Sequence, residues 1–321
     1  RWRMRRVDVF NGDADGLCSL RQLRLAEPAE SQLVTGVKRD ISLLDRVDAG
    51  AGDSVTVLDV SLERNREGLL RLLARGARVR YFDHHFAGEV PAHPGLEAVI
   101  DPAEGICTSM LVDRYLHGRH RIWAVVGAFG DSLDETALAL GAGLALGPAR
   151  IEQLRELGRS LNYNAYGESE SDLLVAPEAL YRSLALYDEP FGFISGSDLL
   201  RRLDAARRAD LEAALAQRAR WSREGASLYV LPDAPWSRRV HGTFANHLAA
   251  VHRDRAHAVL APMTGGSYVV SVRAPAGEGI GAEEFCRQFP AGGGRRTAAG
   301  IDRLPPERLA EFQERFVETF E

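Results

Sequence analysis

The chain has 321 residues, 45% of them hydrophobic, and a formal net charge of −5. This length predicts two domains, and the acidic balance excludes a global attraction to polyanions, so contact with nucleic acid requires a local basic patch. Three scattered cysteines, Cys18, Cys107 and Cys286, exclude a disulfide framework or a cysteine zinc site. They indicate a cytoplasmic protein, and no apolar run approaches the ~20 residues that cross a bilayer, so no membrane partner is expected.

The first part of the chain alternates predicted strands and helices. Strands are expected at 7–10, 32–37, 54–60 and 77–83, with helices at 17–27, 41–49 and 66–76 between them. This βαβ rhythm predicts an α/β domain with a doubly wound parallel sheet and helices on both faces. Residues 105–160 are expected to be largely helical.

The second part changes in character. A long amphipathic helix, capped by Ser197 and closed by Gly225, is expected to link two domains. Beyond it, strands at 227–232, 256–262 and 267–275 and helices at 243–252 and 307–320 predict a smaller α/β domain with a mixed sheet. We therefore expect a first domain at 1–160, a helical extension and linker at 161–225, and a second domain at 226–321.

The segment "NGDADG" combines three candidate metal ligands, Asn11, Asp13 and Asp15, with Gly16. The same pattern begins a calcium-binding EF-hand loop, but such a loop needs a glutamate at its twelfth position and a helix before it. Here the twelfth residue is Gln22 and the preceding segment is a predicted strand. The aspartates instead follow the carboxyl end of a strand, where open α/β sheets bind ligands.

Further acidic and histidine residues follow other predicted strands and an apolar run: Asp59 in "LDVS", Asp83, His84 and His85 in "FDHH", and Asp131 in "GDS". Adjacent strand ends of a parallel sheet converge, so these groups are expected to meet. Gathered carboxylates repel one another unless cations compensate them, and oxygen ligands with an imidazole suit Mn²⁺ or Mg²⁺. A helix N-cap is the alternative role for a single aspartate, and Asp15 and Asp131 both fit it.

In this order, "DADG", "LDVS", "FDHH" and "GD" resemble the four motifs of the DHH phosphoesterase superfamily. The segment "GGGRRTAAG" resembles the glycine-rich signature of the DHH-associated C-terminal domain, and "SYVVSVRAP" resembles its strand with a substrate-gripping arginine. The resemblance covers nearly the full chain, in the layout of RecJ-type exonucleases and the smaller oligoribonucleases.

The resemblance implies two Mn²⁺ (or Mg²⁺) ions. Asp59 would bridge them, with Asp13 on one ion and Asp15, His84 and Asp131 on the other. Together with Asp59, His85 would act at the substrate phosphate, and Asp83 would orient a ligand histidine. Thr108 and Ser109 match small hydroxyl residues of the family or simply begin a helix. The substrate would be held by residues of the second domain: Arg273, Gly292, Gly293, Gly294 and Arg295.

The chain departs from the family pattern at two positions. Val9 stands where the family usually has a histidine four residues before the first aspartate, so the first metal site is expected to be weak, with Asn11 as a substitute ligand. Arg295 replaces the histidine that follows the glycines, and its guanidinium can clamp a phosphate through two hydrogen bonds.

The function indicated is a metal-dependent phosphohydrolase that acts on short oligonucleotides or adenosine 3′,5′-bisphosphate through water activated by two metals. The alternatives are a RecJ-like single-strand exonuclease, a linear or cyclic dinucleotide phosphodiesterase, and a non-hydrolytic nucleotide-binding regulator, the last favoured by Val9. The expected partner is a short RNA or DNA oligonucleotide or a small nucleotide, and homodimer formation stays open.

Overall fold

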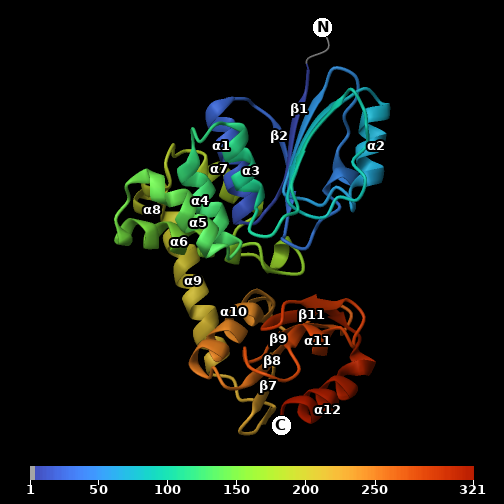
Figure 1. Ribbon diagram of the computed structural model, residues 1–321, viewed down its shortest axis with the longest axis vertical. Coiled ribbons are helices and arrows are strands. Elements are labelled where there is room, and N and C mark those ends of the chain that lie inside the picture. Colours follow the sequence, from blue (N-terminus) through green and yellow to red (C-terminus); the bar gives the residue numbers. More distant parts are fainter. Residues whose placement is uncertain (1–3) are drawn as a thin grey trace. The chain divides into compact units, whose positions relative to one another are not determined.

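The computed structural model describes residues 4–321. The chain forms two compact units that meet in the sequence between Asp204 and Ala205 (Figure 1). Each unit has its own sheet and its own apolar cores. None of the helices among the described residues is both long enough and apolar enough to span a membrane.

The first unit contains a five-stranded parallel sheet in the order β2-β1-β3-β4-β5. Its strands are β1 (Arg6–Asn11), β2 (Gln32–Gly36), β3 (Ser54–Leu58), β4 (Arg78–Asp83) and β5 (Leu96–Ile100). In this order the chain leaves β1 toward β2 on one side and returns to β3 on the other. The carboxyl ends of β1 and β3 therefore flank a topological switch point, where doubly wound sheets bind ligands.

Helices cover both faces of this sheet, with α1 and α3 on one side and α2 on the other (Figure 1). One apolar layer surrounds Phe10 and Trp123, and the other surrounds Val9, Val57 and Leu69. The second layer contains side chains of α2 (Arg66–Ala74). The first layer contains side chains of seven helices: α1 (Ala14–Ala26), α3 (Thr108–Tyr115), α4 (Arg121–Gly130), α5 (Asp134–Gly141), α6 (Pro148–Tyr163), α7 (Pro177–Leu184) and α8 (Pro190–Gly196). The predicted doubly wound α/β architecture is confirmed.

The prediction of a helix at 41–49 is wrong, because this segment contains only a short 3-10 turn, Leu43–Arg46. Asn65 satisfies the backbone here in place of helical hydrogen bonds. Its side-chain oxygen accepts from the Leu44 amide at 3.1 Å, and its amide donates to the Ile41 carbonyl at 2.6 Å. Edge strand β5 was not predicted from the sequence.

The long helix α9 (Asp198–Leu215) begins as expected after Ser197, whose hydroxyl accepts from the Leu200 amide at 3.2 Å. It ends ten residues before Gly225, where the sequence had placed its end. The intervening chain forms β6 (Trp221–Ser222), which pairs with β7 (Ala226–Val230), so its backbone hydrogen bonds are made within a sheet. Within the segment 161–225, helices α7 and α8 contribute side chains to the core of the first unit.

The second unit contains a six-stranded sheet in the order β10-β11-β9-β8-β7-β6. The pair β7 (Ala226–Val230) and β8 (Ala256–Pro262) is parallel, and the other pairs are antiparallel, so the expected mixed sheet is confirmed. The remaining strands are β9 (Tyr268–Arg273), β10 (Gly292–Gly294) and β11 (Ala298–Leu304). Helix α10 (Pro235–Val251) packs in one apolar cluster, and α11 (Ala282–Cys286) and α12 (Leu309–Phe320) pack in another.

Candidate metal centre

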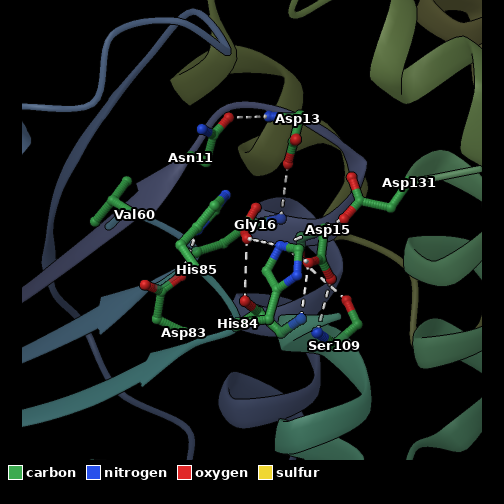
Figure 2. A network of polar contacts seen from close by, with 12 residues as sticks. Asn11, Asp13, Asp15, Gly16, Val60, Asp83, His84, His85, Ser109 and Asp131 are labelled. Atoms are coloured by element: carbon green, nitrogen blue, oxygen red, sulfur yellow. Dashed lines mark hydrogen bonds and ion pairs between the residues drawn. The ribbon is translucent and has the colours of Figure 1, made fainter. Parts of the chain in front are cut away.

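A cavity of about 450 Å³ lies at the carboxyl edge of the first sheet. Its lining includes the acidic and histidine residues that follow β1, β3, β4 and α4, namely Asp13, Asp59, His84, His85 and Asp131. Asp15 lies beside them, fully buried. Segments far apart in the sequence thus bring their polar groups to one place (Figure 2).

The loop after β1 is fixed by its own side chains. The Asp13 carboxylate caps α1 by accepting from the Gly16 amide at 3.0 Å, and Asn11 accepts from the Asp13 amide at 3.1 Å. A Cβ at Gly16 would lie 2.0 Å from the Asn11 carbonyl oxygen, so only glycine fits there. This tight turn sets the start of α1, and with it the positions of Asp13 and Asp15.

Asp15 is held by the start of helix α3. Its two oxygens accept from the backbone amides of Thr108 at 2.8 Å and Ser109 at 2.7 Å, at a helix terminus that favours negative charge. Burial, followed by the charge of Asp131, nevertheless raises the pKa of Asp15 to about 6. A nearby cation would relieve this repulsion.

Asp59 directly follows β3 with a φ of +61°, a left-handed conformation that non-glycine residues seldom adopt. Its carboxylate accepts from the Thr108 hydroxyl at 3.0 Å. Burial and the charges of Asp15 and Asp13 raise the pKa of Asp59 well above its usual range. The unusual backbone and the crowding of carboxylates coincide at one residue, as is common at functional sites.

Asp131 is the C-cap of α4, not a helix N-cap. Ser132 follows it with a φ of +59°, and its amide donates to the Phe129 carbonyl at 3.0 Å. The amide of Leu133 donates to the Ala128 carbonyl at 2.9 Å, which completes a Schellman motif. This turn ends the helix at the cavity and fixes the position of the Asp131 carboxylate.

The imidazole of His84 lies among three of these carboxylates (Figure 2). Its Nε2 lies 3.3 Å from Asp59 Oδ1, 3.5 Å from Asp131 Oδ2 and 3.9 Å from Asp15 Oδ2. Neighbouring ligands of an octahedral ion with bonds of ~2.1 Å are separated by ~3 Å, so a small contraction would produce a coordination shell. Hard oxygen donors with one imidazole fit Mn²⁺ or Mg²⁺.

Two groups of three residues could each hold an ion: Asp15 with His84 and Asp131, and Asp59 with His84 and His85. Among the described residues, Asp13 belongs to neither group. The two groups share His84, so they describe neighbouring positions of one small site.

His85 is oriented by Asp83. Its Nδ1 lies 2.6 Å from Asp83 Oδ1, so the bond to Asp83 uses Nδ1 and not Nε2. The Asp83 side chain is fully buried. Burial lowers the pKa of His85, but the bond to Asp83 outweighs it and the net pKa is raised. The carboxylate that was expected to orient a ligand histidine therefore contacts His85 and not His84.

Lys38, which the sequence reasoning missed, also lines the cavity. Its Nζ lies 2.6 Å from Asp13 Oδ2 and 3.4 Å from Asp131 Oδ1. Burial raises the pKa of Asp13, but the Lys38 ammonium outweighs it and the net pKa is lowered. The signal that could have revealed this residue is its rarity: it is the only lysine in the sequence.

Positions 9 and 11, which were considered in connection with a further metal ligand, have other structural roles. Val9 is completely buried in the apolar layer under α2. The Asn11 amide donates to the Lys38 carbonyl at 3.0 Å while its oxygen accepts from the Asp13 amide, so both polar atoms of Asn11 serve the loop.

The candidate substrate residues of the second unit lie on one part of its sheet. Arg273 ends β9, and its Nε donates to Asn246 of α10 at 2.7 Å. The glycines expected to hold the substrate, Gly292, Gly293 and Gly294, form strand β10, which pairs with β11. Arg295 is exposed in the turn between these strands.

Close packing explains two of these glycines. A Cβ at Gly292 would lie 1.8 Å from the Cys286 carbonyl oxygen, and one at Gly294 would lie 2.5 Å from the Ala299 Cα, whereas nothing lies within 4 Å at Gly293.

No family model matches the chain, and no curated protein matches it. Among solved structures, the chain is similar to an exonuclease RecJ bound to manganese over 98% of this chain and 91% of that one, with 20% identity and a TM-score of 0.62. It is similar to RecJ from Thermus thermophilus in complex with Mn²⁺, with 22% identity and a TM-score of 0.66. That match covers 98% of this chain and 52% of the Thermus protein.

A third similar structure is PggH, a pGpG-specific phosphodiesterase from Vibrio, with 15% identity, a TM-score of 0.54 and 98% of both chains covered. These likenesses extend over nearly the whole chain and confirm the two-part fold that the motifs had predicted.

Proposed function

We propose that the protein is a metal-dependent phosphohydrolase that uses Mn²⁺ or Mg²⁺. The observation that carries this proposal is the convergence of Asp15, Asp59, His84 and Asp131 at the switch point of the first sheet. RecJ structures with the same fold contain manganese, and the similar Vibrio protein is a phosphodiesterase, which supports both the metal and the reaction class.

The bound ion would supply a Lewis acid for the phosphate and activate water at neutral pH. The chain contributes the positions of the reacting groups. The Thr108 hydroxyl fixes Asp59, and the amides at the start of α3 fix Asp15. Asp83 is a positioning residue, because its bond to Nδ1 leaves His85 Nε2 to contact a phosphate oxygen of the substrate.

Short substrates, such as oligonucleotides of a few residues or adenosine 3′,5′-bisphosphate, agree best with this chain. Its net charge of −5 provides no broad electrostatic attraction for long polyanions. The similar Vibrio protein, whose match covers 98% of both chains, is a phosphodiesterase specific for the dinucleotide pGpG, which supports a short substrate. In the second unit, Arg273, Arg295 and the glycines of β10 are the proposed phosphate-binding groups.

The test is a substrate panel with added Mn²⁺: two- to five-residue RNA, adenosine 3′,5′-bisphosphate, pGpG, cyclic dinucleotides, pyrophosphate and single-stranded DNA. We expect hydrolysis of a short substrate by the wild type, and a loss of more than ~10³-fold in Asp59→Asn because the site loses a carboxylate. Asp45→Asn, a change of the same kind at an exposed position, should retain full activity. Equal turnover by the wild type and Asp59→Asn would contradict the proposal.

A further inference from the structure

Lys38 lies just beyond the end of β2, and its backbone is fixed from two sides. Its amide donates to the Ala165 carbonyl at 2.9 Å, and its carbonyl accepts from the Asn11 side chain at 3.0 Å. Asn11 also accepts from the amide of Asp13, so one side chain connects the backbone of Lys38 to the loop that carries the first carboxylate. The lysine is therefore attached to the site through both its backbone and its ammonium.

The ammonium contacts carboxylates on one side of the site. It lies 2.6 Å from Asp13 Oδ2, and the other oxygen of Asp13 accepts from the Gly16 amide, so both oxygens of that carboxylate are engaged. It lies 3.4 Å from Asp131 Oδ1, whereas Asp131 Oδ2 faces His84 Nε2 at 3.5 Å. Asp131 thus contacts the lysine with one oxygen and the candidate ion site with the other.

The choice of residue also matters. The sequence contains 40 lysines and arginines, and Lys38 is the only lysine among them. An ammonium is a compact point charge with donors in several directions, whereas a guanidinium is a planar fork. In a chain that otherwise uses arginine for every fixed positive charge, the single compact cation lies between two carboxylates of the candidate metal centre.

We propose, on the basis of the proposed function, that the Lys38 ammonium is a built-in cation that replaces a second divalent ion at Asp13. The centre then binds one divalent ion, held by Asp15, His84 and Asp131 together with Asp59. The second ion of the arrangement implied by the sequence resemblance would lie at Asp13, the carboxylate that the ammonium already contacts. A second ion would also lie against the ammonium charge, which repels it.

The position of Lys38 agrees with this role. Its side chain is 39% exposed and lines the cavity, while the carboxylate of Asp13 that it contacts is buried.

The experiment counts Mn²⁺ ions per full-length chain after metal removal, by calorimetry and by the electron paramagnetic resonance signal of free Mn²⁺. We expect one ion in the wild type and in Lys38→Arg, and two ions in Lys38→Met, where the charge is lost but the side-chain length is kept. Arg64→Met removes a positive charge from the lining of the same cavity and should leave the count at one. Two ions in the wild type, none in the wild type, or one in Lys38→Met would overturn the proposal.

A second measurement does not depend on the folding of a variant. Acetylation of the folded wild type neutralises Lys38 and the N-terminal amine, and protein acetylated at the N-terminus alone is the control. The count should rise from one ion to two only when Lys38 is modified, and an unchanged count overturns the proposal. If the count shifts as expected but no substrate of the panel is hydrolysed, the built-in cation stands and the proposed function fails.

Discussion

A buried histidine in the second unit makes the stability of that unit depend on pH in a way that can be calculated. His257 of β8 is completely buried, with Nδ1 at 2.7 Å from the Ser227 hydroxyl and Nε2 at 3.3 Å from the His252 carbonyl. Burial lowers its pKa from the ordinary value of 6.5 to about 4. In the unfolded chain the imidazole takes up a proton below pH 6.5, whereas in the folded unit it stays neutral down to about pH 4.

The sign follows from this difference. The stabilisation is fully present above pH 6.5 and is lost as the pH falls toward 4, because the unfolded state binds the additional proton. Each pKa unit corresponds to about 1.4 kcal/mol, so the loss amounts to roughly 3 kcal/mol across this window. It should appear in the hydrogen exchange of the β7 and β8 amides, measured on the full chain between pH 4 and pH 7.

The matched variant is His257→Asn, which keeps a polar group near Ser227 but does not titrate. Its stability should be lower at neutral pH and should lack the histidine contribution to the pH dependence. The control, His247→Asn, removes a histidine of α10 in the same unit and should retain the wild-type slope. The same slope in wild type and His257→Asn would refute the assignment.

Three further predictions concern single contacts. Thr108→Val removes the hydroxyl that donates to Asp59 and should weaken Mn²⁺ binding by about tenfold in calorimetry. An unchanged affinity for Mn²⁺ would show that this hydroxyl does not position Asp59. Gly127→Ala places a methyl 2.2 Å from a hydroxyl of α3 and should cost ~1–3 kcal/mol in urea unfolding. Gly143→Ala, in open space, is its control. Arg295→Ala should raise KM more for a substrate with a terminal phosphate than for one without, and equal changes would exclude a phosphate contact.

The sequence was sufficient for the parallel sheet and for the meeting of the acidic segments. Strand length and β-branched residues indicated the strands, and the carboxyl ends of parallel strands necessarily lie at the same edge. Asp13, Asp59 and His84 could therefore be grouped without knowledge of the strand order.

Other parts of the structure depend on tertiary contacts that the local sequence pattern does not reveal. Lys38 follows β2, and it reaches Asp13 because β2 pairs with β1, which the sequence does not specify. Asp131 fits a helix N-cap by residue type, yet it ends a helix because Ser132 adopts a left-handed conformation that local propensity disfavours. The apolar periodicity of 41–49 predicted a helix, but the side chain of Asn65 bonds the backbone there in its place.

The dispersed origin of the proposed metal-binding groups has a consequence for how the protein is made. Asp15, Asp59, His84 and Asp131 come from separate segments, and Asp131 is positioned only after α4 has formed and packed. Contacts between such distant segments form late in folding, and during synthesis they must wait for the later segment to emerge. The nascent chain therefore cannot assemble the proposed ion site until most of the first unit has been translated, so binding of the ion would follow the folding of this unit.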